Sequence, residues 1–523
     1  MYDIKRYNFT KSDLENVKNY RFGNNWPIVY ILENGKEAYI GEAGSAYRRA
    51  QQHLQNPERL KLHNFYIIAD DEYNKSATLD IESSLIKYMS GDGKYLLQNG
   101  NGGIQESDYY DRERYQAKFE VVWSELRKRK IASKDLNQIE NSDLFKYSPY
   151  KSLSPDQLSV VESMLSSIRN NEYNSFLVSG EPGTGKTIVA SYLMKLLSTK
   201  EWSKDLKIGL VIPMTSLRKT LKRVFKTVKG LDSRMVIGPY DVVKDKYDLL
   251  IVDEAHRLQR RVNLTNFPAY DEVNSKLGLK DGTQLDWIMK SSESQILFYD
   301  EFQSVRPGDI RPEELEKYKY QKYKLVSQMR VKGGQDYIKY IKDILNVEQK
   351  EKVYFPNYDF KLFDSIKEMK EAIEEKDKDK NYGLSRLLAG YAWEWKTNKD
   401  EYIDYDIEIE GVKLRWNSVT EDWVNSPNAI NEVGCIHTIQ GYDLNYAGVI
   451  IGPEMSYDEN KNEIVVDRDK YLDFNGRRAI SDLKELEIYI KNIYKTLLTR
   501  GIYGTYVYVV DKNLREYLRR FIY

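Results

Sequence analysis

Between an apolar run and a helical pattern stands the stretch Gly180-Glu181-Pro182-Gly183-Thr184-Gly185-Lys186-Thr187. Residues 175–178 before it are typical of a strand, and residues 188–197 after it have the apolar spacing of a helix. Strand, glycine-rich loop and helix in this order form a P-loop, whose backbone N–H groups and helix N-terminus hold phosphates. In such a loop the lysine reaches the terminal phosphates and the last hydroxyl binds Mg²⁺. The sequence therefore indicates a protein that uses a nucleoside triphosphate together with Mg²⁺.

A P-loop needs a carboxylate at the end of a neighbouring strand, because Mg²⁺ is held by few protein oxygens together with phosphate and water. Residues 248–252 form a strand-like apolar run that is followed by Asp253 and Glu254. We expect Asp253 to join Thr187 at the Mg²⁺ ion. Glu254 is then expected to orient or deprotonate the attacking water.

The composition is that of a globular chain of several domains. Its 523 residues exceed the size of about 250 residues at which a single core stops growing. No apolar stretch approaches the roughly 20 residues of a membrane span and no signal peptide is evident, so we expect a cytoplasmic protein. The single cysteine, Cys435, excludes an internal disulfide. The balance of 80 basic and 80 acidic residues does not itself indicate nucleic acid, although local basic patches still can.

Hydrophobic patterning predicts an α/β protein. Residues 1–20 read as a lead-in, and strands at 26–32 and 37–41 are joined by the hairpin turn Asn34-Gly35. A connecting helix is predicted at 109–130, with a boundary at 141–155. The predicted helices and strands alternate from there on, which favours parallel sheets: helices 156–169, 186–198, 215–228 and 482–499, and strands 175–179, 208–213, 248–253, 295–300, 448–452 and 505–510. The charged stretch 374–380 is predicted to be an exposed turn or linker.

Further motifs, in order along the chain, resemble those of a superfamily 1 helicase, and most closely the Schlafen group 3-like DNA/RNA helicase family. The resemblance covers the chain from about residue 148 to its end, and a signature at 383–395 has no evident chemical role. It places Gln157 near the adenine, Gln303 at the γ-phosphate, and Arg330 and Arg500 as arginines that reach the phosphates. The fifth motif, His437-Thr438-Ile439-Gln440-Gly441-Tyr442-Asp443, adds Gln440 and Gly441 to the nucleotide site.

This resemblance implies ATP as the nucleotide and two RecA-like parallel-sheet lobes, at 151–335 and 336–523, the second with inserted segments. Phosphoryl transfer depends mainly on positioning and charge stabilisation, so arginines far beyond the P-loop act only if the lobes close on ATP. Closure of this kind would move a strand lying across both lobes. An ATP-switched sensor that clamps nucleic acid without moving along it is the alternative.

Residues 22–108 resemble a GIY-YIG nuclease domain, which assigns a small α+β domain to 1–108 and a helical linker to 109–150. The two tripeptides correspond to Ile28-Val29-Tyr30 and Tyr39-Ile40-Gly41, with isoleucine and Glu42 where glycine and lysine are common. The resemblance implies catalytic roles for these residues: Tyr30, Tyr39, Arg49, His53, Glu82 and Asn99, with Asn101 as an alternative to the last. Glu82 would hold one Mg²⁺ or Mn²⁺, Arg49 would neutralise developing charge, and Tyr30 or Tyr39 would accept the proton of the attacking water.

Together these patterns predict an ATP-dependent translocase or helicase fused to a metal-dependent endonuclease. Nucleic acid is the expected partner, with DNA favoured over RNA, in defence against foreign DNA or in repair. The alternative for the first domain is a DNA-binding module that does not cleave.

Overall fold

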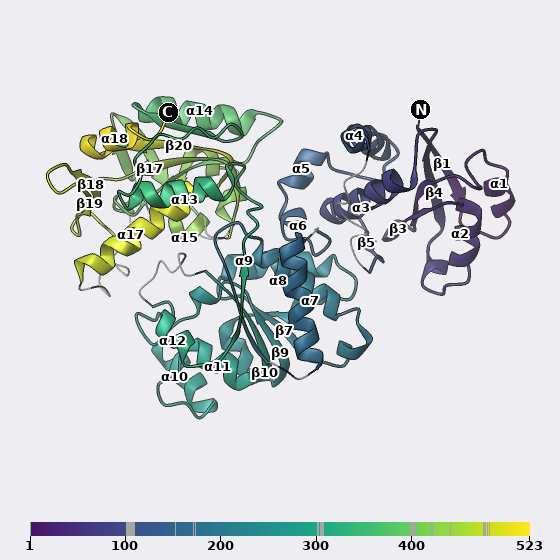
Figure 1. Cartoon of the computed structure of the whole chain (residues 1–523), viewed down its shortest axis with the longest axis horizontal. Helices are drawn as coiled ribbons and strands as arrows, with labels where there is room; N and C mark the ends of the chain where they lie inside the picture. The colour runs from purple at the N-terminus through teal and green to yellow at the C-terminus, as the bar shows by residue number, and fades with distance from the viewer. Residues whose placement is uncertain are drawn as a thin grey trace. The chain divides into compact units, whose positions relative to one another are not determined.

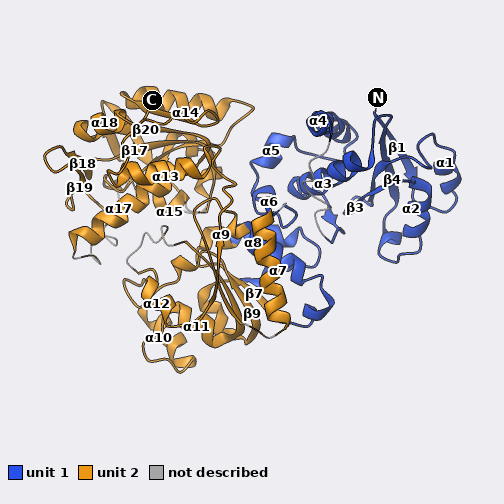
Figure 2. Cartoon of the chain, in the orientation of Figure 1, with its two compact units in different colours: residues 1–154, 188–206, 219–236 blue, residues 155–187, 207–218, 237–523 orange. Residues whose placement is uncertain are grey.

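The computed structural model describes residues 2–100, 110–151, 153–170, 172, 174–300, 303, 308–397, 403–419, 422–439, 441–473, 477, 480 and 482–523. The chain divides into two compact units (Figure 2). Unit 1 comprises residues 1–154, 188–206 and 219–236, and unit 2 comprises residues 155–187, 207–218 and 237–523. None of the helices in the described parts has the length and apolarity that crossing a membrane requires.

Unit 1 contains a five-stranded sheet in the order β1-β4-β2-β3-β5 (Figure 1). Its strands are β1 (Tyr2–Asn8), β2 (Ile28–Glu33), β3 (Glu37–Ala43), β4 (Asn64–Asp70) and β5 (Leu96–Leu97). The predicted hairpin is confirmed, since β2 pairs with β3 and the Asn34 side chain accepts hydrogen bonds from the backbone of Lys36 and Glu37 at 3.0 and 2.7 Å. The prediction of a lead-in at residues 1–20 was wrong for Tyr2–Asn8, which form a strand. This edge strand is mostly polar, and its pairing with β4 rather than its own sequence pattern defines it.

Helices complete the core of unit 1, and α3 and α4 contribute aromatic side chains to it. They are α1 (Leu14–Lys18), α2 (Ala46–His53), α3 (Lys75–Asp92), α4 (Arg112–Lys128), α5 (Leu136–Glu140) and α6 (Asp143–Lys146). The ring of Tyr88 on α3 lies 5.3 Å from Phe119, 5.9 Å from Trp123 and 5.1 Å from Phe145. The helical segment after the first sheet therefore shares one hydrophobic core with it.

Unit 2 contains a sheet of order β11-β6-β10-β9-β7-β8. The strands are β6 (Ser175–Gly180), β7 (Ile208–Val211), β8 (Val236–Ile237), β9 (Tyr247–Val252), β10 (Ser292–Tyr299) and β11 (Gln321–Leu325). Parallel pairing joins β11, β6, β10, β9 and β7, as the alternating pattern predicted. The accompanying helices are α7 (Pro155–Arg169), α8 (Lys186–Leu197), α9 (Thr215–Lys226), α10 (Phe267–Lys276), α11 (Gln284–Ser291) and α12 (Pro312–Glu316). Both α8 and α9 begin in unit 2 and continue into unit 1.

A second sheet of unit 2 has the order β12-β20-β17-β13-β16-β15-β14. Its strands are β12 (Asp359–Phe363), β13 (Ser385–Ala389), β14 (Ile407–Ile409), β15 (Val412–Trp416), β16 (Glu432–Gly434), β17 (Leu444–Ile451) and β20 (Gly501–Val509). Its helices are α13 (Gly334–Leu345), α14 (Ile366–Lys378), α15 (Ile436–Ile439), α17 (Leu483–Leu498) and α18 (Lys512–Arg519). The hairpin of β18 (Met455–Asp458) and β19 (Glu463–Val466) forms a separate two-stranded antiparallel sheet.

The linker prediction for 374–380 was wrong, because residues up to Lys378 belong to α14. Ile366, Met369 and Ile373 of this helix are buried, and its charged residue Asp377 pairs with the buried Arg386. A stretch of alternating charges lacks the apolar positions that precede it in the same helix. The prediction considered only the polar end.

Candidate functional site

The P-loop in unit 2 lies between the end of β6 and the start of α8. Gly183 and Gly185 have φ of +86° and +78°, the left-handed region that favours glycine. A Cβ atom on Gly183 would lie 2.1 Å from Oε1 of Gln328. The loop is therefore in close contact with the segment that follows β11.

The Lys186 ammonium donates three hydrogen bonds. It donates to the carbonyl oxygens of Gly180 at 2.6 Å and Glu181 at 3.0 Å, and to Oδ2 of Asp300 at 3.0 Å. The side chains of Lys186 and Asp300 are 5% and 1% exposed. Asp300 was not among the predicted site residues, although it lies inside the third helicase-like motif.

A chain of side-chain contacts runs from Lys186 to the second sheet. Gln303 donates to Oδ2 of Asp300 at 2.6 Å, and Arg500 donates to Oε1 of Gln303 at 3.3 Å. Arg500 lies between α17 and β20, is 1% exposed, and also donates to the Tyr442 carbonyl at 3.2 Å. The two sheets of unit 2 are thus connected by polar contacts that end at the P-loop lysine.

The two acidic residues after β9 differ in electrostatic environment. Burial raises the pKa of Asp253, the neighbouring charge of Glu254 raises it further, and Thr187 and Lys186 act in the opposite direction. For Glu254 burial also favours the neutral form, but His256 and then Lys186 and Arg500 outweigh it and lower its pKa. Nε2 of His256 lies 2.9 Å from Oε2 of Glu254. Glu254 also has a φ of +54°, a strained value for a residue with a side chain.

The residues after β11 cover the P-loop. Gln328 donates to the Pro182 carbonyl at 2.8 Å, and the Met329 backbone donates to the Gly183 carbonyl at 2.9 Å. The buried Gln157 side chain donates to the Thr184 carbonyl at 2.7 Å and to Sδ of Met329 at 3.1 Å, so it contacts both the loop and a residue that covers the loop.

Arg330 follows these covering residues and forms a 2.5 Å ion pair with Asp443. It is therefore connected to the fifth helicase-like motif. Gly441 of that motif is near Met214 and Leu217, and Gln440 lies outside the described residues.

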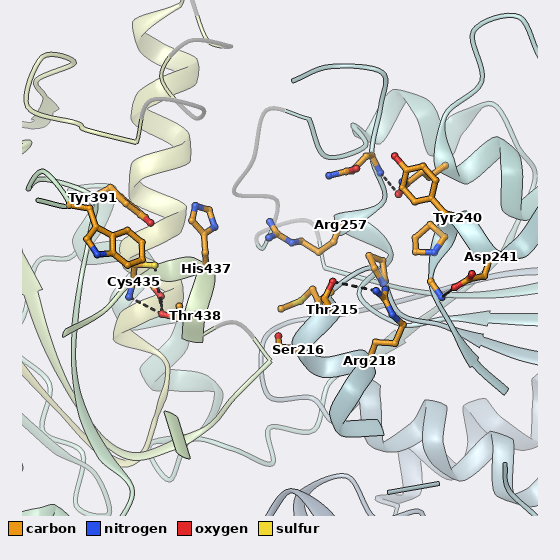
Figure 3. Close-up of a pocket in the computed structure, with 17 residues that line it drawn as sticks. Thr215, Ser216, Arg218, Tyr240, Asp241, Arg257, Tyr391, Cys435, His437 and Thr438 are labelled. Atoms are coloured by element: carbon orange, nitrogen blue, oxygen red, sulfur yellow. Dashed lines mark hydrogen bonds between the residues drawn. The ribbon is translucent and has the colours of Figure 1, made fainter. Parts of the chain in front are cut away.

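A pocket of about 670 Å³ in unit 2 is lined from both sheets (Figure 3). Figure 3 shows Thr215, Ser216 and Arg218 of α9 on one side and His437 and Thr438 of α15 on the other. Aromatic side chains of Tyr240, Tyr391 and Trp395 also line it, with the basic Arg257. His437 is held by Asp473, whose Oδ2 lies 3.3 Å from its Nε2.

The signature at 383–395 has a structural explanation. Arg386 is buried and donates to the Val424 carbonyl at 2.8 and 3.1 Å and to Asp377 at 2.7 Å. A Cβ on Gly390 would lie 2.4 Å from the Tyr494 hydroxyl. These residues fix β13 and the loop that carries Tyr391 and Trp395 to the pocket.

In unit 1 a polar cluster lies against the hairpin. The fully buried Tyr30 hydroxyl lies 2.7 Å from Nε2 of His53 and accepts from Nε of Arg49 at 3.2 Å. Burial, then Arg49 and Arg59, lower the pKa of His53 to about 4. Because the neutral ring can accept at Nε2, Tyr30 is placed to donate there. The half-buried Tyr39 has its ring 5.1 Å from His53, and the Arg59 guanidinium lies 3.7 Å from its centroid.

Two further predicted residues border this cluster. Burial and then the charge of Glu42 raise the pKa of Glu82 on α3 to about 7. Glu42 itself is paired with Lys75. Asn99 forms two hydrogen bonds with the Ile40 backbone at 2.8 and 3.1 Å, which fixes β3. No group of three or more His, Cys, Asp or Glu arranged to hold a metal occurs within the described ranges.

The model of the Schlafen group 3 DNA/RNA helicase domain matches residues 174–511. The chain belongs to this family. The Uncharacterized protein YPL245W of Saccharomyces cerevisiae is 30% identical over 428 residues, which cover 70% of this chain and 90% of that protein.

Solved structures resemble this family member more distantly. The Pif1 helicase from Candida albicans is 12% identical over 71% of this chain and 98% of its own, with a TM-score of 0.30. The Pif1 helicase from Bacteroides, solved with ADP-AlF3 and single-stranded DNA, is 10% identical over 68% of this chain and 92% of its own, with a TM-score of 0.28.

The Schlafen group 3 match includes the P-loop, Asp253, Gln303, Arg330 and Arg500. It begins after Gln157 and after the whole N-terminal cluster. Three residues that contact predicted site residues were not themselves predicted as site residues: Asp300, His256 and Asp443. Each lies inside or next to a recognised motif, and this position in the motif could have identified them.

Proposed function

We propose that this Schlafen group 3 family member is an ATP-dependent nucleic-acid translocase or helicase. The observation that carries the proposal is the continuous contact from Lys186 through Asp300 and Gln303 to Arg500. It joins the phosphate loop of one sheet to an arginine at the edge of the other. A change at the phosphates would therefore be transmitted to both sheets, as the mechanism of a two-lobed motor requires.

The residues of the proposed ATP site fit a magnesium nucleotide. Both carboxylate oxygens of Asp253 are buried and neither meets hydrogen-bond geometry, and Thr187 is close enough to lower its pKa. Mg²⁺ bound there would neutralise phosphate charge. Glu254, kept ionised by His256, would accept a proton from the attacking water. Gln157 would contribute to adenine recognition.

Arginines would stabilise the charge that develops in the reaction. Arg500 is already connected to the phosphate loop, whereas Arg330 would have to exchange Asp443 for a phosphate. Gln440 and Gly441 are proposed at the same site on the resemblance alone. In this proposal the lobes comprise residues 151–335 and 336–523.

The pocket lined by α9 and α15 is the proposed place of the nucleic-acid strand. Aromatic rings stack on bases of any sequence, and basic groups bind the backbone. Tyr240, Tyr391 and Trp395 supply the rings, and Arg218 and Arg257 supply the charge. A strand held from both sides would shift when the lobes close. DNA rather than RNA remains the proposed track.

For the N-terminal domain, residues 1–108, we propose a metal-dependent endonuclease of the GIY-YIG type. The cluster of Tyr30, Arg49 and His53 next to Tyr39 and Glu82 supports it. Glu82 is half-buried and would bind one Mg²⁺ or Mn²⁺ in its ionised form, while Arg49 would neutralise the phosphate. Of the two tyrosines, the half-buried Tyr39 is better placed to meet water than Tyr30. Asn99 would act by fixing β3. The setting, defence against foreign DNA or repair in the cytoplasm, rests on the fused arrangement alone.

One experiment tests both parts. Plasmid, linear and single-stranded DNA and RNA are incubated with the protein, with and without ATP, in Mg²⁺ or Mn²⁺. We expect single-stranded nucleic acid to stimulate ATP hydrolysis in the wild type and not in Lys186→Ala, and metal-dependent cleavage to vanish in Arg49→Ala and Glu82→Ala.

The outcomes distinguish the alternative functions. If no nucleic acid stimulates ATP hydrolysis, the proposed translocase or helicase function is refuted. Stimulation without displacement of a strand or of streptavidin would instead indicate an ATP-switched clamp. Cleavage that persists in both N-terminal variants would refute their assigned roles, and no cleavage at all would leave a binding module.

A further inference from the structure

A second cavity in unit 2 has no role in the function proposed above. Its volume is about 500 Å³, and it is lined by the end of β10, by α12 and by the facing sides of α13 and α17. Its charged lining residues are mostly basic: Arg311, Lys342, Lys491 and Lys495 against Glu313 and Glu485. Arg311 and Glu485 neutralise each other at 3.0 Å, and Lys491 is paired with Glu487 at 2.6 Å. Of the other lining charges, Lys342 and Lys495 outnumber Glu313, which favours an anion.

Lys495 is the unusual member of this lining. It is 4% exposed on α17, five residues before Arg500. Lysine is almost never fully buried without a compensating charge. Burial lowers the pKa of Lys495, and the negative charges of Glu181 and Asp300 act in the opposite direction. The Lys495 ammonium therefore lies within electrostatic reach of the P-loop and of the carboxylate that binds Lys186.

The wall of the cavity also borders the proposed hydrolytic site. Tyr299 lines the cavity, and the next residue, Asp300, binds Lys186. The ring of Tyr299 lies edge-on to His256 with centroids 6.3 Å apart, and His256 contacts Glu254. A cavity with basic lining thus lies directly behind the residues that would cleave the γ-phosphate.

We propose that this cavity binds inorganic phosphate, the product of the ATP hydrolysis proposed above, and that Lys495 is the cation shared by the cavity and the nucleotide site. The inference rests on the proposed function. A cavity of this size accommodates a phosphate ion together with several waters, each of which needs about 30 Å³. Lys342 on α13 faces the same cavity from the other helix and assists.

The test measures phosphate binding and phosphate inhibition. Line broadening of inorganic phosphate in ³¹P NMR is recorded with protein saturated with ADP and Mg²⁺, so that the P-loop is occupied. Inhibition of steady-state ATP hydrolysis by added phosphate is measured in parallel. We expect Lys495→Gln to weaken both effects about tenfold, the size expected for loss of one charge-assisted contact. Lys495→Arg should retain most of the effect.

Lys370→Gln on α14 is the matched control, since Lys370 is a half-buried helical lysine paired with Glu374 and outside the cavity. It should behave as the wild type. Lys342→Gln gives a second reading if Lys495→Gln does not fold. Equal phosphate inhibition in the wild type and in both cavity variants, or no line broadening by the wild type, would overturn the proposal. Absence of ATP hydrolysis in the wild type would instead refute the proposed function.

Discussion

Replacing Asp300 with asparagine should strengthen ATP binding and slow ATP hydrolysis. A lysine ammonium has three donors, and those of Lys186 are directed at Gly180, Glu181 and Asp300. Lys186 must therefore give up at least one bond before it can donate to a phosphate. Only the bond to Asp300, among these three, joins two ionised groups, so it is the strongest competitor.

The magnitude follows from this competition. A hydrogen bond to a charged group contributes about 1.5–3 kcal/mol. Asparagine retains an oxygen acceptor for the charged ammonium, so Asp300→Asn lowers this bond from the upper towards the lower end of that range and removes about 0.5–1.5 kcal/mol of competition for Lys186. At about 1.4 kcal/mol per tenfold change, the ATP dissociation constant should fall by about 2- to 10-fold. Hydrolysis should slow because Asp300 also holds Gln303, which contacts Arg500.

The assay is an equilibrium titration with a fluorescent ATP analogue, followed by turnover measurements. Asp309→Asn is the matched control, since Asp309 and Arg257 form another buried ion pair at 3.0 Å, with side chains 1% and 4% exposed. The control loses a comparable ion pair and some stability, but its ATP affinity should equal that of the wild type. ATP binding by Asp300→Asn that is no tighter than in this control would refute the reasoning.

Three other changes have defined outcomes. Glu254→Gln should reduce ATP turnover by about 100-fold or more, the usual contribution of a general base, with ATP affinity retained in the same titration. Gly41→Ala should destabilise the protein by about 1–3 kcal/mol through overpacking, measured by chemical denaturation, because its Cβ would lie 2.2 Å from the Tyr30 hydroxyl. Burial raises the pKa of Glu454 to about 7, so its contribution to stability is complete below the usual glutamate pKa and is lost as the pH rises through 7. Denaturation midpoints from pH 5 to 8 should show this loss in the wild type and a flatter profile in Glu454→Gln.

Structural elements could be predicted from the sequence where their pattern is local. The P-loop, the hairpin at Asn34-Gly35 and the strands β6, β7, β9, β10, β17 and β20 each have a periodicity or turn chemistry that neighbouring residues determine. Elements that depend on distant partners were missed. The edge strand Tyr2–Asn8 has only Ile4 buried and forms because β4 offers its backbone.

The candidate sites divide in the same way. The motifs identified the candidate site residues, but not the side chains that these residues contact. Lys186 was evident from the P-loop, whereas its bond to Asp300 spans 114 positions. The contact of Gln303 with Arg500 spans 197 positions. Such contacts are set by the order of strands in the sheets, which spacing along the chain does not encode.

The start of β17 shows how sheet order also couples the two proposed arginines. Arg500 donates to the Tyr442 carbonyl, and Leu444 pairs with Gly501 where β17 and β20 begin. The next residue after Tyr442, Asp443, is the partner of Arg330. Residues just before β17 therefore contact both arginines, although the two arginines lie 170 positions apart in the chain. If these residues shift when the two lobes close on ATP, Arg500 would move and Arg330 would be released at the same time. The two arginines would then reach the phosphates in one step.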